Sequence, residues 1–172
     1  MASSAQAKEF IKTIGPIIQG IALERGYKVC SAMIAQACLE SAFGTSSLAR
    51  KYHNYFGMKC GSKWKGSSVN LATKEEYKPG TLICVKAYFR TYENMTEGVK
   101  GYFDFISTQR YSNLKDAETP LEYLTMIKND GYATDYRYVN KNLEIVSRYA
   151  LDKWDEALDI HEDETSDGEE DS

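Results

Sequence analysis

The sequence predicts an α+β fold that is mostly helical, with a β-hairpin inserted between the helices. Over most of the chain, apolar residues recur at spacings of three and four, as on one face of a helix. Between residues 69 and 92 the pattern becomes β-leaning around a Pro-Gly pair. Because the chain has 172 residues, 42% hydrophobic and 27% charged, it is long enough for one domain with a true core.

The first helices are predicted from their apolar positions and their breakers. A helix over 6–14 is interrupted at Gly15 and Pro16, and Pro16 suits the first turn of a second helix that reaches Arg25 before a glycine. A third helix, 31–40, consists largely of small and apolar residues, so we assign it to the core.

The middle of the chain predicts a short helix, a loop and the hairpin. Thr45 or Ser46 can cap a helix that runs through Tyr52, and a loop rich in Gly, Ser and Lys follows. The hairpin strands are predicted at 69–77 and 82–92, because Pro followed by Gly fits a tight reversal.

Three further helices are predicted after the hairpin. One begins after Thr96, one begins at Thr119-Pro120 with Leu121 on its buried side, and the last covers 138–158. We find no internal repeat in the chain.

Charge is distributed unevenly along the sequence. The first 154 residues hold all 21 Lys and Arg and 15 acidic residues, a net charge of +6, whereas the last 18 hold ten acidic residues. A basic body favours an anionic partner such as wall polymer, nucleic acid or acidic lipid, although a solvated surface gives the same balance. We expect one domain over 1–158 and an acidic, disordered tail over 159–172.

Neither a membrane span nor a metal site is predicted. No stretch approaches about 18 apolar residues, and the N-terminus lacks the features of a signal peptide. Cys30 and Cys38 would lie about 12 Å apart along one helix, too far for a disulfide. With four cysteines, no CxxC pair and two histidines, we expect reduced, mostly packed thiols, no metal and no cofactor.

Glu40 is the first candidate for chemistry. It ends a nearly uncharged helix and precedes Ser41 and the aromatic Phe43. A carboxyl group in such surroundings loses hydration, which raises its pKa and suits the general acid of a glycosidase. The alternative is a glutamate that faces solvent at a helix end.

The hairpin offers a second carboxylate, at Glu75 or Glu76. Adjacent strand residues point to opposite faces, so only one of the two can face a cleft. Both can equally be solvated charges that protect a sheet edge. An aromatic and polar group adds flat faces for a sugar ring: its members are Tyr52, His53, Asn54, Tyr55, Phe56, Gly57, Met58, Tyr132, Tyr136 and Tyr138.

The run from Ala35 to Lys59 resembles the signature of the family 73 glycoside hydrolases, which are peptidoglycan N-acetylglucosaminidases of autolysins, flagellar-rod hydrolases and phage endolysins. The matching residues are Gln36, Leu39, Glu40, Ser41, Gly44, Ser47, Leu48, Ala49, Asn54, Phe56, Gly57 and Lys59. Two further blocks follow in the family's order: EYKPG with VKAYFRTYEN, and YATDYRY at 132–138. The resemblance covers about residues 10–151.

The resemblance implies a lysozyme-like fold in which the hairpin faces the catalytic helix across a groove. It matches Glu40 to the general acid, Glu76 to the second carboxylate, with Glu75 as the alternative if the register slips by one, and Tyr132 to a tyrosine near the reacting sugar. Asn54, Phe56 and Gly57 match the floor of the cleft.

Two positions depart from the family pattern. Tyr136 stands where proline is usual, and Phe43 where tryptophan is frequent, so we expect both, with Tyr138, to contact substrate.

The implied reaction is hydrolysis of the β-1,4 bond between N-acetylglucosamine and N-acetylmuramic acid. Glu76 would activate water with inversion, or the substrate's acetamido oxygen would attack with retention; carboxyl separations of roughly 6.5–9.5 Å and 5–5.5 Å are typical of inverting and retaining glycosidases. The alternatives are a muramidase or lytic transglycosylase that uses Glu40 alone, and a wall-binding module without turnover.

The expected partner is peptidoglycan, with no nucleic acid, no stable membrane insertion and a monomeric state. Without a signal peptide, the chain suits a phage endolysin that is made in the cytoplasm and acts at the wall. A trimmed, secreted autolysin would look the same.

Overall fold

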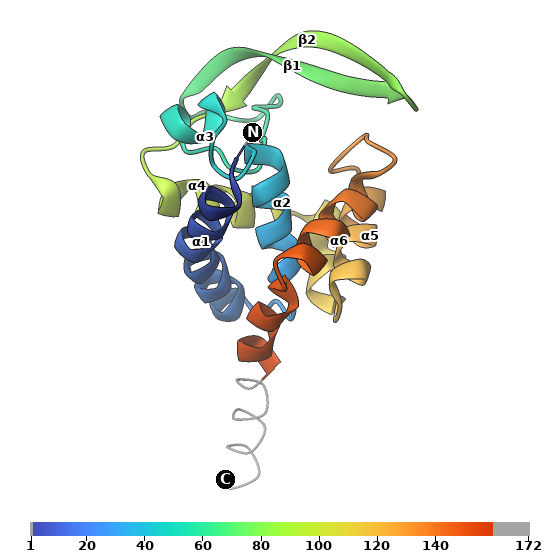
Figure 1. Cartoon of the computed structure of the whole chain (residues 1–172). Coiled ribbons are helices and arrows are strands. Elements are labelled where there is room, and N and C mark those ends of the chain that lie inside the picture. Colours follow the sequence, from blue (N-terminus) through green and yellow to red (C-terminus); the bar gives the residue numbers. More distant parts are fainter. Residues whose placement is uncertain (1, 160–172) are drawn as a thin grey trace, which may run out of the picture.

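The computed structural model describes residues 2–159, apart from the side chains of residues 76 and 77. Figure 1 shows a helical body with the two-stranded hairpin across its top. The elements are α1 (Ser4–Arg25), α2 (Ser31–Ser41), α3 (Ser47–Tyr52), β1 (Ser68–Lys78), β2 (Thr81–Arg90), α4 (Met95–Ile106), the 3-10 helix η1 (Gln109–Asp116), α5 (Pro120–Asn129), α6 (Tyr138–Arg148) and the 3-10 helix η2 (Leu151–Asp155).

The first segment is one helix, so the predicted interruption at Gly15 and Pro16 is wrong. Pro16 lies inside α1, although proline removes one hydrogen bond of the helix. Packing offsets this loss, because Ile14 and Ile18 are fully buried. Gly15 also packs closely: a Cβ placed there would lie 2.6 Å from the ring of Trp154.

Helix α2 lies at the centre of the body, as Figure 1 shows, and packs against α1, α5 and α6. Residues 31–38 are all buried, which confirms the assignment of this helix to the core. Its N-terminus has no local side-chain cap. Instead, Asp155 accepts bonds from the backbone N–H groups of Cys30 and Ser31 at 2.7 and 2.8 Å and from the Ser31 hydroxyl at 2.6 Å.

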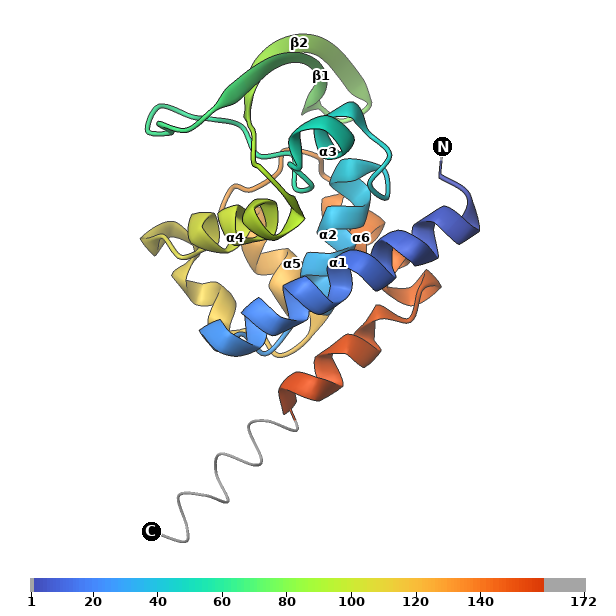
Figure 2. The same cartoon turned by 90° about the vertical axis from the view of Figure 1, so that its left-hand side faces the viewer.

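The hairpin is antiparallel, as predicted, and reverses at Gly80 with a φ of +81°. Thr73 pairs with Val85 and Glu75 with Ile83, and the register shifts between residues 76 and 78. Side-chain exposure alternates along residues 69–75, so one face of β1 turns inward. Both views show the hairpin arching over the helices (Figures 1 and 2).

The second half of the chain confirms some predicted boundaries and corrects others. Thr119 caps α5 with Pro120 in its first turn, as predicted, but Leu121 is 55% exposed and not inside. The predicted helix 138–158 is interrupted after α6, because Ala150 adopts a left-handed backbone with φ of +51°. The 3-10 helix η1 is an element that the sequence analysis did not predict.

The four cysteines are unpaired, and two of them are not packed. Cys30 and Cys38 are buried, Cys60 is half-buried and Cys84 is exposed on β2, so the expectation of mostly packed thiols holds for only two. The predicted acidic tail lies, apart from Asp159, outside the described residues. Among residues 2–159, no helix is both long and apolar enough to span a membrane.

Asp155→Ala tests the distant cap of α2. The variant loses an acceptor for two backbone N–H groups and a hydroxyl, so we expect the free energy of unfolding to fall by about 2 kcal/mol. Asp152→Ala, which removes an exposed carboxylate from the same η2, is the control and should cost less than about 0.5 kcal/mol. Urea unfolding followed by circular dichroism measures both, and equal stabilities would contradict the cap.

Candidate active site

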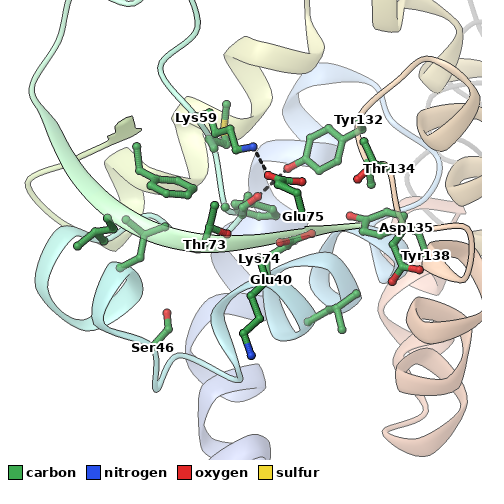
Figure 3. Close-up of a pocket in the computed structure, with 18 of the residues that line it drawn as sticks. Glu40, Ser46, Lys59, Thr73, Lys74, Glu75, Tyr132, Thr134, Asp135 and Tyr138 are labelled. Carbon is green, nitrogen blue, oxygen red and sulfur yellow. Dashed lines mark hydrogen bonds and ion pairs between the residues drawn. The ribbon is translucent and has the colours of Figure 1, made fainter. Parts of the chain in front are cut away.

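A cleft of about 1060 Å³ lies between the hairpin and the helical body. Its walls come from the end of α2, the segment 56–61, the hairpin, and the segment 131–141 that leads into α6. Figure 3 shows Glu40, Glu75, Lys59 and Tyr132 converging there. The titratable side chains that line the cleft are Glu40, Lys59, Lys74, Glu75, Arg90, Arg110, Tyr111, Tyr132, Asp135, Arg137, Tyr138 and Lys141.

Glu40 lies in the last turn of α2 and enters the floor of the cleft half-buried. The helix can end there because Ala42 takes up a left-handed conformation with φ of +49° and its N–H bonds the carbonyl of Cys38. The predicted alternative, a glutamate that faces solvent, does not describe this position.

The surroundings raise the pKa of Glu40 to about 7. Burial is the largest cause, because it disfavours the charged form, and the nearby carboxylates of Glu75 and Asp135 act in the same direction. A hydrogen bond with Tyr138 and the charge of Lys141 lower the pKa and partly offset these effects. Near neutral pH, Glu40 therefore holds a proton far more often than an ordinary glutamate, which is ionised there.

Gly57 forms the wall directly behind the Glu40 carboxyl. Its φ is +64°, and a Cβ built there would lie 2.8 Å from Oε2 of Glu40. The loop that carries Gly57 is fixed by the buried Asn54, which donates to the carbonyls of Met58 and Arg90 and accepts from the Met58 N–H. A glycine at position 57 thus lets backbone and carboxyl approach each other.

Tyr132 and Tyr138 line the other side of the cleft floor. The Tyr132 hydroxyl donates to the carbonyl of Phe56 at 3.0 Å, and burial raises the pKa of both phenols well above the usual value. Phe56 is buried and stacks on Tyr102 with ring centroids 4.0 Å apart. These rings give the floor a rigid aromatic frame.

Glu75 is the hairpin carboxylate that the structure brings into the cleft. It lies on the inward face of β1, its carboxylate forms an ion pair with Lys59, and it acts on the ionisation of Glu40. The ion pair joins the hairpin to the loop below it. Glu76, to which the resemblance pointed first, pairs with Leu82 through its backbone, and its side chain is outside the described part of the chain.

Three predicted site residues do not line the cleft. Phe43 packs edge-on against Tyr149, with centroids 5.4 Å apart, Asn54 is 2% exposed and serves the loop described above, and Tyr136 is 55% exposed beside Arg137. The structure therefore gives Asn54 a supporting place and brings Phe56, Gly57, Tyr132 and Tyr138 to the cleft.

Sequence reasoning assigned no role to Asp135 and Lys141, which form an ion pair in the cleft. A signal for Asp135 was present: it precedes a helix by three residues, and its Oδ1 accepts the N–H of Arg137 at 2.9 Å. Lys141 lies three residues after Tyr138 on α6, and this spacing brings both side chains to the same side of the helix. Within residues 2–159, no three His, Cys, Asp or Glu side chains are grouped to hold a metal ion.

Comparison with known proteins gives a family match and named relatives. Residues 15–151 match the Glucosaminidase family model, described as mannosyl-glycoprotein endo-β-N-acetylglucosaminidase. The peptidoglycan hydrolase FlgJ of Pseudomonas aeruginosa is 35% identical over 147 residues, which are 82% of this chain and 36% of that protein. The exo-glucosaminidase LytG of Bacillus subtilis is 34% identical over 142 residues, 79% of this chain and 49% of that protein.

The fold also matches a solved structure. A C-terminally truncated glycoside hydrolase domain of FlgJ from Salmonella typhimurium superposes with a TM-score of 0.64 at 29% identity, over 83% of this chain and 96% of that one. The predicted lysozyme-like α+β fold is thereby confirmed. The chain spans about half or less of the length of the curated relatives it matches.

Gly57→Ala tests the close approach to Glu40, with Gly61→Ala as a matched control. Both glycines have a φ of +64°, but a Cβ at Gly61 meets nothing within 4 Å. Both variants should lose about 1 kcal/mol of stability, because alanine is strained at positive φ.

Only in Gly57→Ala should the new Cβ displace the Glu40 carboxyl from the backbone towards water, which would lower the pKa of Glu40 from about 7. Titration of the ¹³C-labelled glutamate carboxyls by NMR measures this. The same pKa in both variants would show that Gly57 does not shape the site.

Proposed function

The chain belongs to the glucosaminidase family of glycoside hydrolases, and on this premise we propose that it hydrolyses the β-1,4 bond between N-acetylglucosamine and N-acetylmuramic acid in peptidoglycan. The observation that carries the proposal is a carboxyl group with a pKa of about 7, half-buried at the floor of a cleft between the hairpin and the helices. A group of this kind holds a proton at neutral pH and can give it to a substrate.

Glu40 acts as the general acid in this reaction. Its proton passes to the glycosidic oxygen as the bond to the anomeric carbon breaks, and positive charge develops on the sugar ring. The carboxylate that remains faces this charge. Because Glu40 must be protonated to begin, the rate falls as the pH rises through about 7.

Glu75 is the second carboxylate. Its carboxylate, paired with Lys59, comes from the hairpin side of the cleft and lies close to Glu40. There it activates a water, which inverts the anomeric centre, or it stabilises the charged ring while the acetamido oxygen attacks, which retains it. The configuration of the first product distinguishes the two routes.

The charge of the cleft suits a bacterial wall polymer. Lys and Arg outnumber Asp and Glu among its lining residues, and two of the three carboxylates are already paired with lysines. The stem peptides of peptidoglycan carry free carboxylates, so the surplus favours this substrate. We place the action of the protein at the bacterial cell wall.

Glu40→Gln tests the assignment of the acid. The amide has nearly the same shape but no transferable proton, so we expect release of soluble fragments from purified sacculi to fall at least about 1000-fold with an unchanged circular dichroism spectrum. Activity close to wild type would remove Glu40 from the mechanism.

Mass spectrometry of the wild-type digest identifies the bond and the mode of cleavage. A reducing N-acetylglucosamine end supports the proposal, whereas a reducing muramic acid end or an anhydro-muramyl end would indicate a muramidase or a transglycosylase. Internal fragments in the early digest indicate endo cleavage. Single sugars released from strand ends would instead place the chain with its relative that is named an exo-glucosaminidase.

Glu75→Gln and Glu76→Gln form a matched pair for the second carboxylate. We expect Glu75→Gln to lose about 10- to 1000-fold in activity, since it removes the carboxylate beside Glu40, and Glu76→Gln to lose less than about 3-fold. The same assay of soluble fragments decides between them. The reverse order of effects would transfer the role to Glu76.

A further inference from the structure

A chain of hydrogen bonds runs through the core behind Glu40. Gln36 lies one turn before Glu40 on α2 and is fully buried. Its Nε2 donates to the hydroxyl of Tyr138 at 2.8 Å, and its Oε1 accepts from the hydroxyl of Tyr102 at 2.6 Å. Tyr102 and Tyr123 share a bond of 2.5 Å. At the other end of this network, Tyr138 lies beside the Glu40 carboxyl in the lining of the cleft, and its hydroxyl lowers the pKa of that carboxyl.

The number of protons that these groups can donate fixes which group donates and which accepts in each hydrogen bond. Tyr123 is fully buried, and among residues 2–159 its hydroxyl has no hydrogen-bond partner other than Tyr102. An unpaired buried O–H costs about 1–3 kcal/mol, so Tyr123 donates to Tyr102. Tyr102 in turn donates to Oε1 of Gln36, because an amide oxygen only accepts.

The orientation of the Gln36 amide also fixes the role of the Tyr138 hydroxyl in its bond with Gln36. With its oxygen held by Tyr102, the amide turns its N–H group towards Tyr138, whose oxygen accepts the bond. The Tyr138 hydroxyl then keeps its own proton for an acceptor other than Gln36, and the Glu40 carboxyl beside it can accept that proton. In the reversed chain, Glu40 would donate to Tyr138, and the proton of Tyr123 would have no acceptor.

We propose that Gln36 is a positioning residue, which aims the Tyr138 hydroxyl at Glu40 as a hydrogen-bond donor and is itself held in orientation by Tyr102. The donated bond stabilises the carboxylate that remains after Glu40 gives up its proton. We call the hydrogen-bonded series Tyr123, Tyr102, Gln36 and Tyr138 the relay. It makes Glu40 a stronger acid than its burial alone would allow. The inference rests on the proposed function only for its catalytic meaning, since the hydrogen bonds exist without a substrate.

Several other groups face the Glu40 carboxyl, and substitutions in the relay leave them in place. Glu75 faces it from β1, Asp135 from the loop before α6, and Lys141 from α6 itself, while Tyr132 approaches from the same loop as Asp135. Glu75 and Asp135 are each paired with a lysine. A change in the pKa of Glu40 on altering Gln36 thus reports on the relay.

The test is an NMR titration of the ¹³C-labelled Glu40 carboxyl in three variants. Gln36→Met removes both bonds of the amide, and Tyr102→Phe frees the amide to rotate while keeping the ring that stacks on Phe56. We expect each to raise the pKa of Glu40 by about half to one unit, because the carboxylate loses a fixed donor. Tyr123→Phe is the matched control, since Tyr102 remains as the terminal donor, and should leave the pKa unchanged.

The direction of the shift separates positioning from a merely structural role. A variant that only loosens the core admits water to Glu40, and its pKa falls. If the pKa of Glu40 falls or stays unchanged in folded Gln36→Met, the proposal is overturned. If Gln36→Met does not fold, the pKa of Glu40 in Tyr102→Phe decides in the same way. The titration needs no substrate, so a relay that behaves as expected in a chain without activity on peptidoglycan would refute the proposed function alone.

Discussion

The rest of the structure depends on one constraint: the carboxyl group of Glu40 must lie in surroundings that hold little water and must still reach a substrate. Helix α2 meets it by being buried along almost its whole length and opening only at its last turn, where Glu40 enters the cleft. A helix in this position cannot find water for its first N–H groups. Asp155, from the far end of the chain, supplies the acceptors instead.

The acid strength of Glu40 results from opposing effects. Burial and the carboxylates of Glu75 and Asp135 favour the protonated form, whereas Tyr138 and Lys141 favour the carboxylate. These groups come from two parts of the fold, since Glu75 belongs to the hairpin, whereas Asp135 lies in the loop before α6 and Tyr138 and Lys141 lie in the first turn of α6. The ionisation of one side chain is thus coupled to the assembly of the whole cleft.

The sequence indicated some of the residues that line the cleft, and it predicted some limits of the helices and missed others. The apolar run before Glu40 was visible as a pattern, because a buried helix restricts the residue types allowed, whereas Gly57 was indicated only by the family resemblance. The continuity of α1 through Pro16 was not visible in the sequence, because it depends on packing against distant side chains such as Trp154. The choice between Glu75 and Glu76 depends on strand register, which adjacent glutamates do not reveal, and the place of Phe43 depends on its contact with Tyr149.

The central claim is that the proton on Glu40 is the one used in the reaction. The most direct measurement compares the pH dependence of kcat/KM for soluble peptidoglycan fragments with the ionisation of the Glu40 carboxyl followed by NMR in the same buffer. Our account predicts that kcat/KM falls on the alkaline side at the same pH at which Glu40 ionises, about 7. A rate that stays constant to pH 9 after Glu40 has lost its proton would contradict it.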